Sequence, residues 1–265
     1  MAFSFSSCVP AYETAPNLSV PHGFTTRLGG VSEGVFQSLN LAMHRGDDPE
    51  HVAKNWGILA DSLGFDLKNL ILTHQVHSDV VRRVTRADAM GLDHHRYPEC
   101  DALITDQPGT ALMVFTADCT PILLWDRVNG AVGAVHAGWR GTAADIAGKT
   151  VRAMVNAYGC DPANIHAAIG PNIDFCCFQT DDDVPRAMIE AFGSDALVSI
   201  RPAENKFYVN LKEINALALR RVGVENIFCS ESCTVCQSNR FWSHRVTRGQ
   251  RGSQGAIIVC KGEIA

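Results

Sequence analysis

The sequence predicts a layered α/β (α+β) sandwich with mixed β-sheets in a single domain, with its site at strand ends. The chain has 265 residues, of which 46% are hydrophobic, enough for one large core. Apolar, β-rich runs occur singly, in hairpins and between amphipathic helices, a mixture typical of mixed sheets. No Gly/Ser-rich or Pro-rich linker divides the chain. We therefore expect one catalytic domain at 21–265, preceded by a loose polar arm at 1–20.

The first part of this domain contains several strands and one well-marked helix. A strand is expected at 23–27. Asp48 followed by Pro49 marks a helix start, and apolar residues then recur at helical spacing as far as Gly64. Further strands are expected at 70–73, 80–84, 102–105 and 111–115.

The segment 116–141, TADCTPILLWDRVNGAVGAVHAGWRG, is where we expect the site to form. Its apolar runs at 121–125 and 131–135 are short enough to be buried strands, and DRVNG between them is a strong turn signal. Polar groups stand at the outer ends of both runs, among them Cys119 and His136. The hairpin would bring these two side chains to one edge of a sheet.

Two registers of this hairpin are open. A two-residue turn would pair His136 with Leu123 and leave Cys119 four residues away, roughly 13 Å at the rise of a strand. If all of DRVNG forms the loop, Trp125 faces Ala131 and Cys119 arrives one step from His136. We expect the second register, because it can build a site.

Helices and strands alternate after this hairpin. Thr142 can cap a helix, and a further helix is expected at 181–192. Asn210 and Glu213 resemble a capping box for a helix at 211–222. Strands are expected at 165–169, 207–209, 226–229 and 256–259.

Composition excludes several classes of function. The net charge is −5 and the pI about 6.0, without a basic block, so nucleic acid is not an expected partner. No run of eighteen apolar residues predicts a membrane span, and the start of the sequence lacks the pattern of a signal peptide. Without an export signal, the ten cysteines are expected to be reduced. These features favour a cytoplasmic protein.

Some conspicuous motifs are expected to carry no chemistry. The Gly-rich turn at 28–33 lacks the GxGxxG spacing of dinucleotide-binding loops. The adjacent His94 and His95 lie in a polar, irregular segment and are expected to be solvated. A lone CxxC is a weak signal for zinc or redox chemistry, and the paired cysteines are expected to be packing or turn residues: Cys176, Cys177, Cys233 and Cys236.

A thiol and an imidazole that converge at strand ends have three interpretations. Cys119 can be a buried core residue beside a hydrogen-bonded His136. It can be a nucleophile activated by that histidine. It can also be a metal ligand, with His77, which follows the strand near 70–72, as a third ligand. Two imidazoles and one thiolate suit Zn²⁺ and leave a fourth tetrahedral position open.

Six motifs in order resemble one family: THQVHSDVV, CDALITDQPG, TADCTPILLWD, VGAVHAGWRGT, GPNIDFCCFQ and FWSHR. With HGFTTRLGGVSEGVF upstream, they make most of the chain similar to the bacterial polyphenol-oxidase-like (laccase-domain) proteins, now largely described as purine nucleoside phosphorylases. The resemblance implies a zinc enzyme that cleaves the N-glycosidic bond of adenosine, inosine or guanosine with phosphate. Adenosine deamination and methylthioadenosine phosphorolysis are also credited to this family.

The resemblance also assigns residues. His77, Cys119 and His136 match the metal-binding and catalytic positions, and His77 is preferred to His74 because it occupies the QVH position. Asp118 could orient one of the histidines or bond its own backbone in a turn. Arginine side chains are expected to bind phosphate, because the guanidinium group can bind it bidentately. The expected substrate-binding residues are Arg27, Asn40, Arg140 and Arg245.

The chain departs from the family pattern at the expected substrate pocket. Phe178 and Gln179 stand where Tyr-Glu is usual, His244 where Tyr is usual, and Val246 where Arg is usual. These changes concern the pocket rather than the metal ligands.

Three rival functions use the same residues. The first is a copper-dependent polyphenol oxidase; a laccase needs several copper centres rich in histidine, whereas the sequence offers ligands for one metal ion. The second is a Cys–His hydrolase, with Cys119 as nucleophile and His136 as base, that edits amides in peptidoglycan precursors. The third is a metal-binding protein without catalysis. The oligomeric state and the preferred nucleoside stay open.

Overall fold

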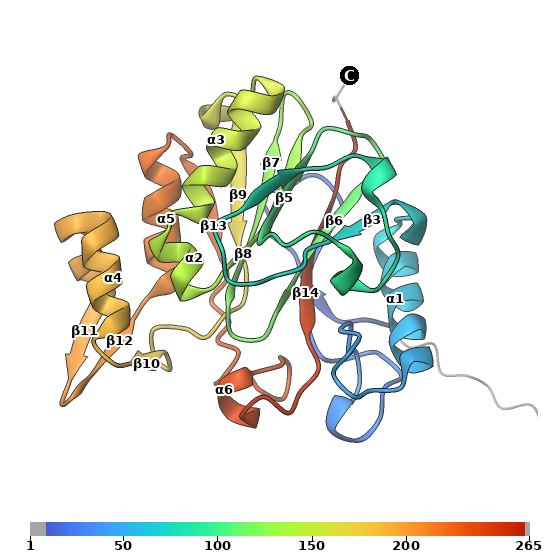
Figure 1. Ribbon diagram of the computed structural model, residues 1–265, viewed down its shortest axis with the longest axis horizontal. Coiled ribbons are helices and arrows are strands. Elements are labelled where there is room, and N and C mark those ends of the chain that lie inside the picture. Colours follow the sequence, from blue (N-terminus) through green and yellow to red (C-terminus); the bar gives the residue numbers. More distant parts are fainter. Residues whose placement is uncertain (1–8, 263–265) are drawn as a thin grey trace, which may run out of the picture.

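Two mixed β-sheets stacked face to face form the centre of the molecule, as the computed structural model of residues 9–262 shows (Figure 1). The six-stranded sheet has the order β13 (Asn226–Cys229), β9 (Ile165–Ile169), β7 (Thr120–Asp126), β8 (Val132–Ala137), β5 (Ala102–Thr105) and β4 (Val81–Arg83). The five-stranded sheet has the order β1 (Tyr12–Glu13), β2 (His22–Thr25), β14 (Gln254–Val259), β6 (Ala111–Thr116) and β3 (Leu70–Leu72). A small third sheet contains β10 (Gln179–Thr180), β12 (Lys206–Val209) and β11 (Ile200–Ala203).

Helices cover the outer faces of the two large sheets (Figure 1). The α-helices are α1 (Pro49–Leu63), α2 (Trp139–Ala143), α3 (Ile146–Tyr158), α4 (Asp183–Phe192), α5 (Leu211–Arg221) and α6 (His244–Thr247). Short 3₁₀ turns occupy Gly34–Phe36, Leu67–Asn69, Arg86–Asp88, His94–Arg96, Pro162–Asn164 and Gly193–Ser199. Within residues 9–262, no helix is both long and apolar enough to cross a membrane.

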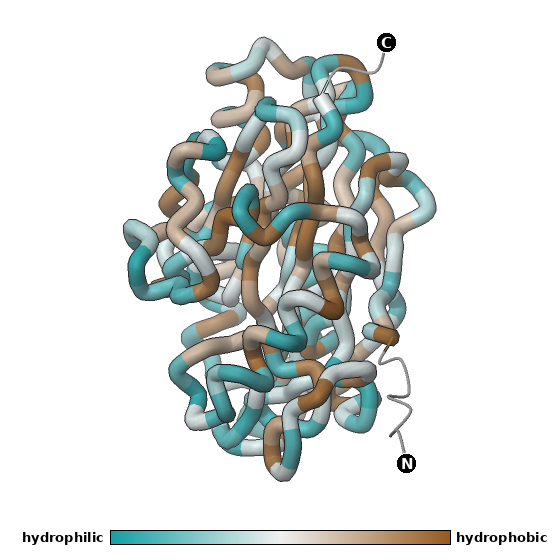
Figure 2. Tube along the Cα trace, turned by 90° about the vertical axis from the view of Figure 1, so that its right-hand side faces the viewer, coloured by the Kyte–Doolittle hydropathy of each residue, from teal (hydrophilic) through white to brown (hydrophobic). Residues whose placement is uncertain are grey.

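Strand β7 shows how the layers share their cores. Leu123 and Trp125 point into the core between the two sheets, whereas Ile122 and Leu124 point into the core beneath the helices α3 and α5. This alternation follows from the two-residue period of a strand. Burying one such side chain contributes about 1.5–3 kcal/mol. The apolar segments accordingly gather in the interior strands, with hydrophilic segments in the outer loops (Figure 2).

Local signals explain most helix ends. The Asp48 side chain accepts a hydrogen bond from the Glu50 backbone N–H at 2.8 Å, and Gly64 ends α1 with φ +71°. Asn210 caps α5 in the same way, through the backbone N–H of Glu213. These expectations from the sequence are confirmed.

The cap expected at Thr142 is wrong. Thr142 lies inside α2, where its hydroxyl accepts from the Asn215 amide. The longer helix α3 starts only after Asp145, whose side chain accepts from the backbone N–H of Gly148. The Asp145 backbone lies in the left-handed region, with φ +59°, so the chain turns between the two helices.

The register of the central hairpin differs by one residue from the one expected. Trp125 pairs with Val132 rather than with Ala131, because Asp126 extends the ladder by one pair. The Asp126 carboxylate accepts from the backbone N–H of Val128 and so stabilises a shorter loop. The first pair of the ladder joins Thr120 to Ala137. Cys119 therefore lies just outside the strand.

Part of the expected loose arm packs against the body. Residues 1–8 lie outside the described part of the chain. From residue 9 on, β1 pairs with β2, and Ala15, Leu18 and Val20 are buried in the core. Residues 10–20 are therefore not loose, because most of their apolar side chains are covered, whereas Val9 is exposed.

Candidate functional site

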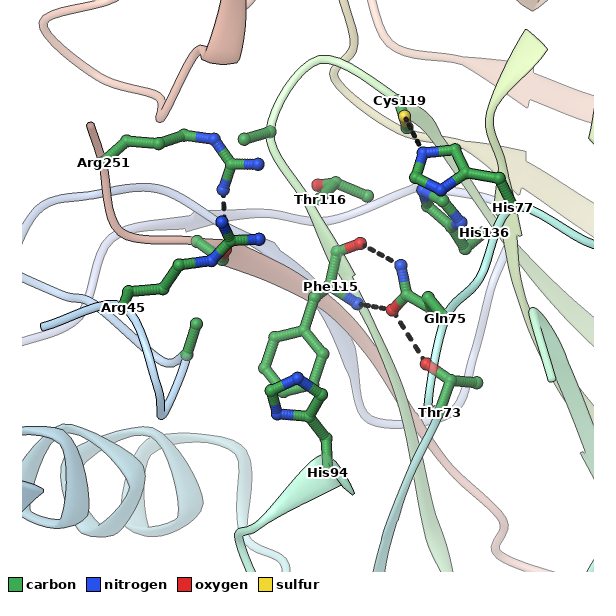
Figure 3. Close-up of a pocket in the computed structure, with 13 residues that line it drawn as sticks. Arg45, Thr73, Gln75, His77, His94, Phe115, Thr116, Cys119, His136 and Arg251 are labelled. Atoms are coloured by element: carbon green, nitrogen blue, oxygen red, sulfur yellow. Dashed lines mark hydrogen bonds between the residues drawn. The ribbon is translucent and has the colours of Figure 1, made fainter. Parts of the chain in front are cut away.

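Three side chains with metal-binding atoms meet at one end of β8: His77, Cys119 and His136. Their ligand atoms all lie within 4.8 Å of one another, and Cys119 Sγ stands 3.8 Å from His77 Nε2. The two imidazole rings meet edge to face, with centroids 5.0 Å apart. Figure 3 shows the three side chains on one side of a cavity. His74 lies apart from this group, because its Nδ1 bonds the Tyr97 carbonyl oxygen.

Asp101, the residue before β5, positions two of these residues, one through its side chain and one through its backbone. It is fully buried, and its Oδ1 accepts from His136 Nδ1 at 2.7 Å and from the His77 backbone N–H at 3.1 Å. Its Oδ2 accepts from the backbone N–H groups of Val76 and Ser78 and from the Ser78 hydroxyl. Since Nδ1 of His136 is occupied, Nε2 is the nitrogen left to face the thiol.

The same contacts shift the acidities of the group. Burial raises the pKa of Cys119, but the charge and hydrogen bond of His136 and the hydrogen bond of His77 lower it to about 6. Burial lowers the pKa of His136, but Cys119 and Asp101 raise it to about 9. Burial raises the pKa of Asp101, and its bonds to His136 and Ser78 lower it to about 2. The two opposite shifts favour a thiolate–imidazolium pair when no metal is bound.

Gly138 leaves room for the close approach of these side chains. A Cβ at this position would lie 2.8 Å from His77 Cδ2 and 3.5 Å from Cys119 Sγ. Any side chain here would displace His77, so the glycine is required by space rather than by backbone conformation, which is extended.

Two adjoining cavities open beside the group. The first has a volume of about 130 Å³ and is also lined by His94 and Phe115. The second has a volume of about 370 Å³, which falls within the range of small-molecule sites, and is also lined by Phe178. His77 and Cys119 line both cavities, so the group stands where they meet.

Two arginines, Arg45 and Arg251, also line both cavities, and Figure 3 shows them across the cavity from the histidines. Arg251 Nη1 donates to the Gly252 carbonyl and the Ser253 hydroxyl, each at 2.8 Å, and its Nε is buried without a partner among the described residues. Burial and the charge of Arg45 lower the pKa of Arg251 to about 10, so it stays protonated at neutral pH. Within residues 9–262, neither arginine forms an ion pair. The pair is suited to an anion.

His94 was expected to be solvated, and this expectation is wrong. Its ring lies 5.3 Å from that of Phe115, and both side chains line the first cavity. Nδ1 of His94 is buried and has no hydrogen-bond partner in the described part of the chain. Burial and the charge of His95 lower the pKa of His94 to about 4. The imidazole is therefore neutral at physiological pH and can hydrogen-bond a ligand.

Arg27 lies outside the lining of both cavities. Its Nε and Nη2 donate to the Gln37 carbonyl oxygen, and its Nη1 donates to that of Ser238. The guanidinium also stacks on Trp242, 4.0 Å from the ring centroid. All three guanidinium nitrogens thus hold backbone in place, a role that sequence position alone does not reveal.

Asn40 likewise supports the site from outside the cavities. It is fully buried, and its Oδ1 accepts from the backbone N–H groups of Ala42 and Ser253. Its Nδ2 donates to Asp47 at 2.9 Å. Ala42 and Ser253 line the first cavity, so Asn40 joins two segments of its wall.

The remaining two expected substrate residues differ from each other. Arg140 is exposed on α2 and stacks on Trp139, away from both cavities. Arg245 lines the second cavity, although its Nη2 donates to the Gln179 carbonyl oxygen at 3.1 Å. Only Arg245 of the four expected residues therefore reaches a cavity.

Asp118 has neither of the roles considered for it. Its carboxylate accepts from the hydroxyls of Thr234 and Ser243 and from the backbone N–H of Arg245. These bonds tie the segment before β7 to the late part of the chain. The carboxylate that orients the histidines is Asp101, which the motif CDALITDQPG contains but whose role was missed.

Comparison with known proteins gives consistent matches. The family model described as multi-copper polyphenol oxidoreductase laccase matches residues 21–261. A Deinococcus radiodurans protein named purine nucleoside phosphorylase is 41% identical over 244 residues, covering 92% of this chain and 90% of the relative. Adenosine deaminase RL5, from an unknown prokaryotic organism, is 36% identical over 229 residues, covering 84% and 87%. The crystal structure of Bacillus licheniformis hypothetical protein YfiH matches with a TM-score of 0.90 at 35% identity, covering 97% and 98%.

Fold and relatives together define an enzyme of the mixed α/β class. The chain belongs to the laccase-like polyphenol oxidoreductase family, to which its motifs pointed. The predicted fold class, a sandwich with mixed sheets in a single domain, is confirmed.

Proposed function

We propose that the protein is a zinc-dependent purine nucleoside phosphorylase, acting on adenosine, inosine or guanosine with phosphate. One observation carries the proposal: the group of His77, Cys119 and His136 faces the pair Arg45 and Arg251 across adjoining cavities. A metal-binding group beside an anion-binding pair fits a reaction in which phosphate attacks a bound nucleoside. The names of several relatives support the reaction type. Methylthioadenosine is a further candidate substrate.

The donor set fits zinc with one open position. In a tetrahedral site with Zn–S near 2.3 Å and Zn–N near 2.0–2.1 Å, ligand atoms stand roughly 3.4–3.6 Å apart. Cys119 Sγ and His77 Nε2 are 3.8 Å apart, and all ligand atoms lie within 4.8 Å. Bound zinc would supply a Lewis acid and lower the pKa of a water in the open position. Copper suits the same soft donors, so metal analysis must identify the ion.

Arg45 and Arg251 are the residues proposed to hold phosphate. Guanidinium groups bind phosphate oxygens bidentately, and the Nε of Arg251 still lacks a partner among the described residues. Two adjacent cations without ion pairs also gain by neutralisation when a dianion binds. Phosphate held here would be oriented for attack on the sugar carbon C1′ of a nucleoside in the neighbouring cavity.

Phe115 and His94 are the residues proposed to receive the purine base. The aromatic ring offers a surface for stacking, and the neutral imidazole offers a free nitrogen for a hydrogen bond. As the glycosidic bond breaks, negative charge develops on the base, and a donor to a ring nitrogen would stabilise it.

Two alternative reactions fit the same side chains. Adenosine deamination is suggested by the name of one relative and requires an activated water rather than phosphate. A Cys–His hydrolase is favoured by the hydrogen bond from His136 to Asp101 and by the position of the Cys119 thiol within 4.8 Å of the His136 imidazole. Such a hydrolase would work without metal, whereas both nucleoside reactions are proposed to need it.

We place the activity in the cytoplasm, since the nine cysteines within residues 9–262 are free.

Phosphate-dependent release of hypoxanthine from inosine tests the main proposal. Arg251→Ala should raise the KM for phosphate at least about tenfold, since a charge-assisted bidentate contact contributes about 1.5–3 kcal/mol. Arg140→Ala is the matched control, because Arg140 is exposed and lies outside both cavities. The His77–Cys119–His136 group should hold about one metal ion, and His136→Ala should lower the metal content of the chain by that one ion. Product release that is independent of phosphate, or unaffected by Arg251→Ala, would refute the proposal.

A further inference from the structure

A second cluster of metal-binding side chains lies outside the cavities described above. Four cysteines place their sulfurs within 4.8 Å of one another, and we call them the four-cysteine cluster: Cys176, Cys177, Cys233 and Cys236. They come from two loops, one after β9 and one after β13. These strands are parallel neighbours, so their carboxyl ends and the loops that follow meet at the same edge of the sheet.

We propose that the four-cysteine cluster binds a structural Zn²⁺ ion. This proposal goes beyond the proposed function and does not rest on it. The sequence alone offered only a weak signal here, because Cys176-Cys177 and the CxxC motif are far apart along the chain. The fold supplies the missing evidence by bringing the two pairs together.

The sulfur distances fit one tetrahedral ion. Three of the sulfurs stand 3.4, 3.5 and 3.6 Å apart, close to the edge of roughly 3.8 Å that a Zn–S length of about 2.3 Å gives. A disulfide requires about 2.05 Å, so the sulfurs are not bonded to each other. An iron–sulfur cluster would hold its cysteine sulfurs farther apart, because several iron atoms and inorganic sulfides separate them.

The backbone around the cluster also suits a thiolate site. Asn172 and Cys233 form an isolated parallel bridge, and the Thr234 N–H donates to the Asn172 carbonyl at 2.9 Å, which joins the loops. The backbone N–H of Asp174 points at Cys233 Sγ, 3.4 Å away. The buried Lys212 ammonium lies against the same segments, through the Asp174 carboxylate. The Asp174 N–H offsets part of the negative charge of a Cys233 thiolate. The Lys212 ammonium is neutralised by Asp174 and, by also donating to the Ser232 carbonyl oxygen, holds the two loops together.

Binding involves no redox change. Each thiol that becomes a ligand loses its proton to solvent, so four thiols and Zn²⁺ give a complex of charge −2 and release up to four protons. All four positions of the ion are filled by sulfur, as in structural rather than catalytic zinc sites. The ion would therefore link the two loops and take no part in the reaction.

The consequence for the cavities is indirect. Phe178, which follows Cys177, lines the second cavity, and Arg245 Nη1 lies 3.4 Å from the Cys177 carbonyl oxygen. The Asp118 carboxylate binds Thr234, which follows Cys233. An ion in the cluster would hold these wall segments at fixed positions.

The test uses the full-length chain with His77→Ala and His136→Ala, which removes the proposed catalytic ligands, purified under reducing conditions. Elemental analysis should find about one zinc per chain, and X-ray absorption at the zinc edge should show about four sulfurs near 2.3 Å. Adding Cys236→Ser should lower the retained zinc at least about tenfold after competition with a chromophoric chelator. Cys229→Ser is the matched control, since Cys229 ends β13 but lies outside the cluster.

If Cys236→Ser does not fold, the X-ray absorption spectrum of the His77→Ala, His136→Ala chain decides the question. A cobalt-substituted sample of the same chain should show the sulfur-to-metal charge-transfer band of a tetrahedral thiolate site. Absence of zinc in this chain, nitrogen or oxygen neighbours in place of sulfur, or a disulfide within the cluster would each overturn the proposal. None of these outcomes depends on enzymatic activity, so they do not bear on the proposed phosphorylase.

Discussion

Replacing Asp101 by Asn should weaken both the fold and the metal site. Asparagine keeps the shape of the side chain, but one carboxylate oxygen becomes an amide that donates rather than accepts. If the amide replaces Oδ1, it faces His136 Nδ1–H and the His77 backbone N–H, which both need an acceptor. Each buried donor without a partner costs about 1–3 kcal/mol, so the free energy of unfolding should fall by about 2–6 kcal/mol.

The imidazole has one way to relieve part of this cost. His136 can accept from the new amide through Nδ1, but its proton then moves to Nε2, the nitrogen that faces Cys119. A protonated Nε2 cannot bind a metal, so metal affinity should fall by about 10–100-fold, as expected when a partner of a metal ligand is lost. The two losses are therefore linked through a single proton.

The pH dependence gives an independent estimate of the same interaction. Asp101 has a folded-state pKa of about 2, below its usual value of 3.8, so it stabilises the fold above pH 3.8. The difference corresponds to about 2 kcal/mol, which is lost as the pH falls from about 4 to 2. Asn at this position should lack that component of acid sensitivity.

Urea unfolding of the metal-free protein and chelator competition with the metal-loaded protein measure the two effects. Asp106→Asn is the control, because this exposed carboxylate lies at the other end of β5. If Asp101→Asn unfolds at the urea concentration of the wild type and keeps its metal affinity, the role assigned to Asp101 is wrong.

Three further predictions concern single residues. In metal-free protein, the rate of alkylation of Cys119 by iodoacetamide, followed by mass spectrometry, should fall with a midpoint near pH 6 as the pH is lowered. His136→Ala should move this midpoint up towards that of a free thiol, and a wild-type midpoint above pH 8 would contradict the prediction. Gly138→Ala should reduce metal affinity at least about tenfold by displacing His77 while the melting temperature changes little; unchanged affinity would show that the imidazole can move freely. Asp48→Ala should cost about 1 kcal/mol in urea unfolding through loss of the α1 cap, and a change below a few tenths would show that the cap is not needed.

Much of the fold could be predicted from the sequence, because local signals and tertiary structure agree. The strands at 102–105, 165–169 and 226–229 were expected at their observed bounds, since each is a short apolar run between turn residues. The hairpin register was missed by one residue because Asp126 was assigned to the loop. Its side chain bonds the loop while its backbone stays in the ladder, and no pattern of apolar residues distinguishes these roles.

Only the metal-binding side of the site could be predicted from the sequence, and its two arginines could not. The three side chains with metal-binding atoms follow or precede apolar strands, so periodicity places them at a sheet edge. Arg45 and Arg251 lie in irregular segments that are far apart in the sequence. Long-range hydrogen bonds hold these segments together, such as the bond from the Ser253 backbone N–H to Asn40, which spans 213 residues. Arg27 shows the opposite error. It stands in a motif that resembles the family, but its guanidinium binds backbone carbonyls.

The position of β14 has a consequence for how the chain acquires its structure during synthesis. This strand follows all the others in sequence, yet it lies in the middle of its sheet, between β2 and β6. Until residues 254–259 have left the ribosome, β2 and β6 each present an unpaired edge that can pair with other chains. The five-stranded sheet therefore cannot be completed before β14 is available, and contacts between such distant segments form slowly. A nascent chain of this protein should depend on chaperones until β14 closes the sheet, and the same insertion brings Arg251 to the cavity.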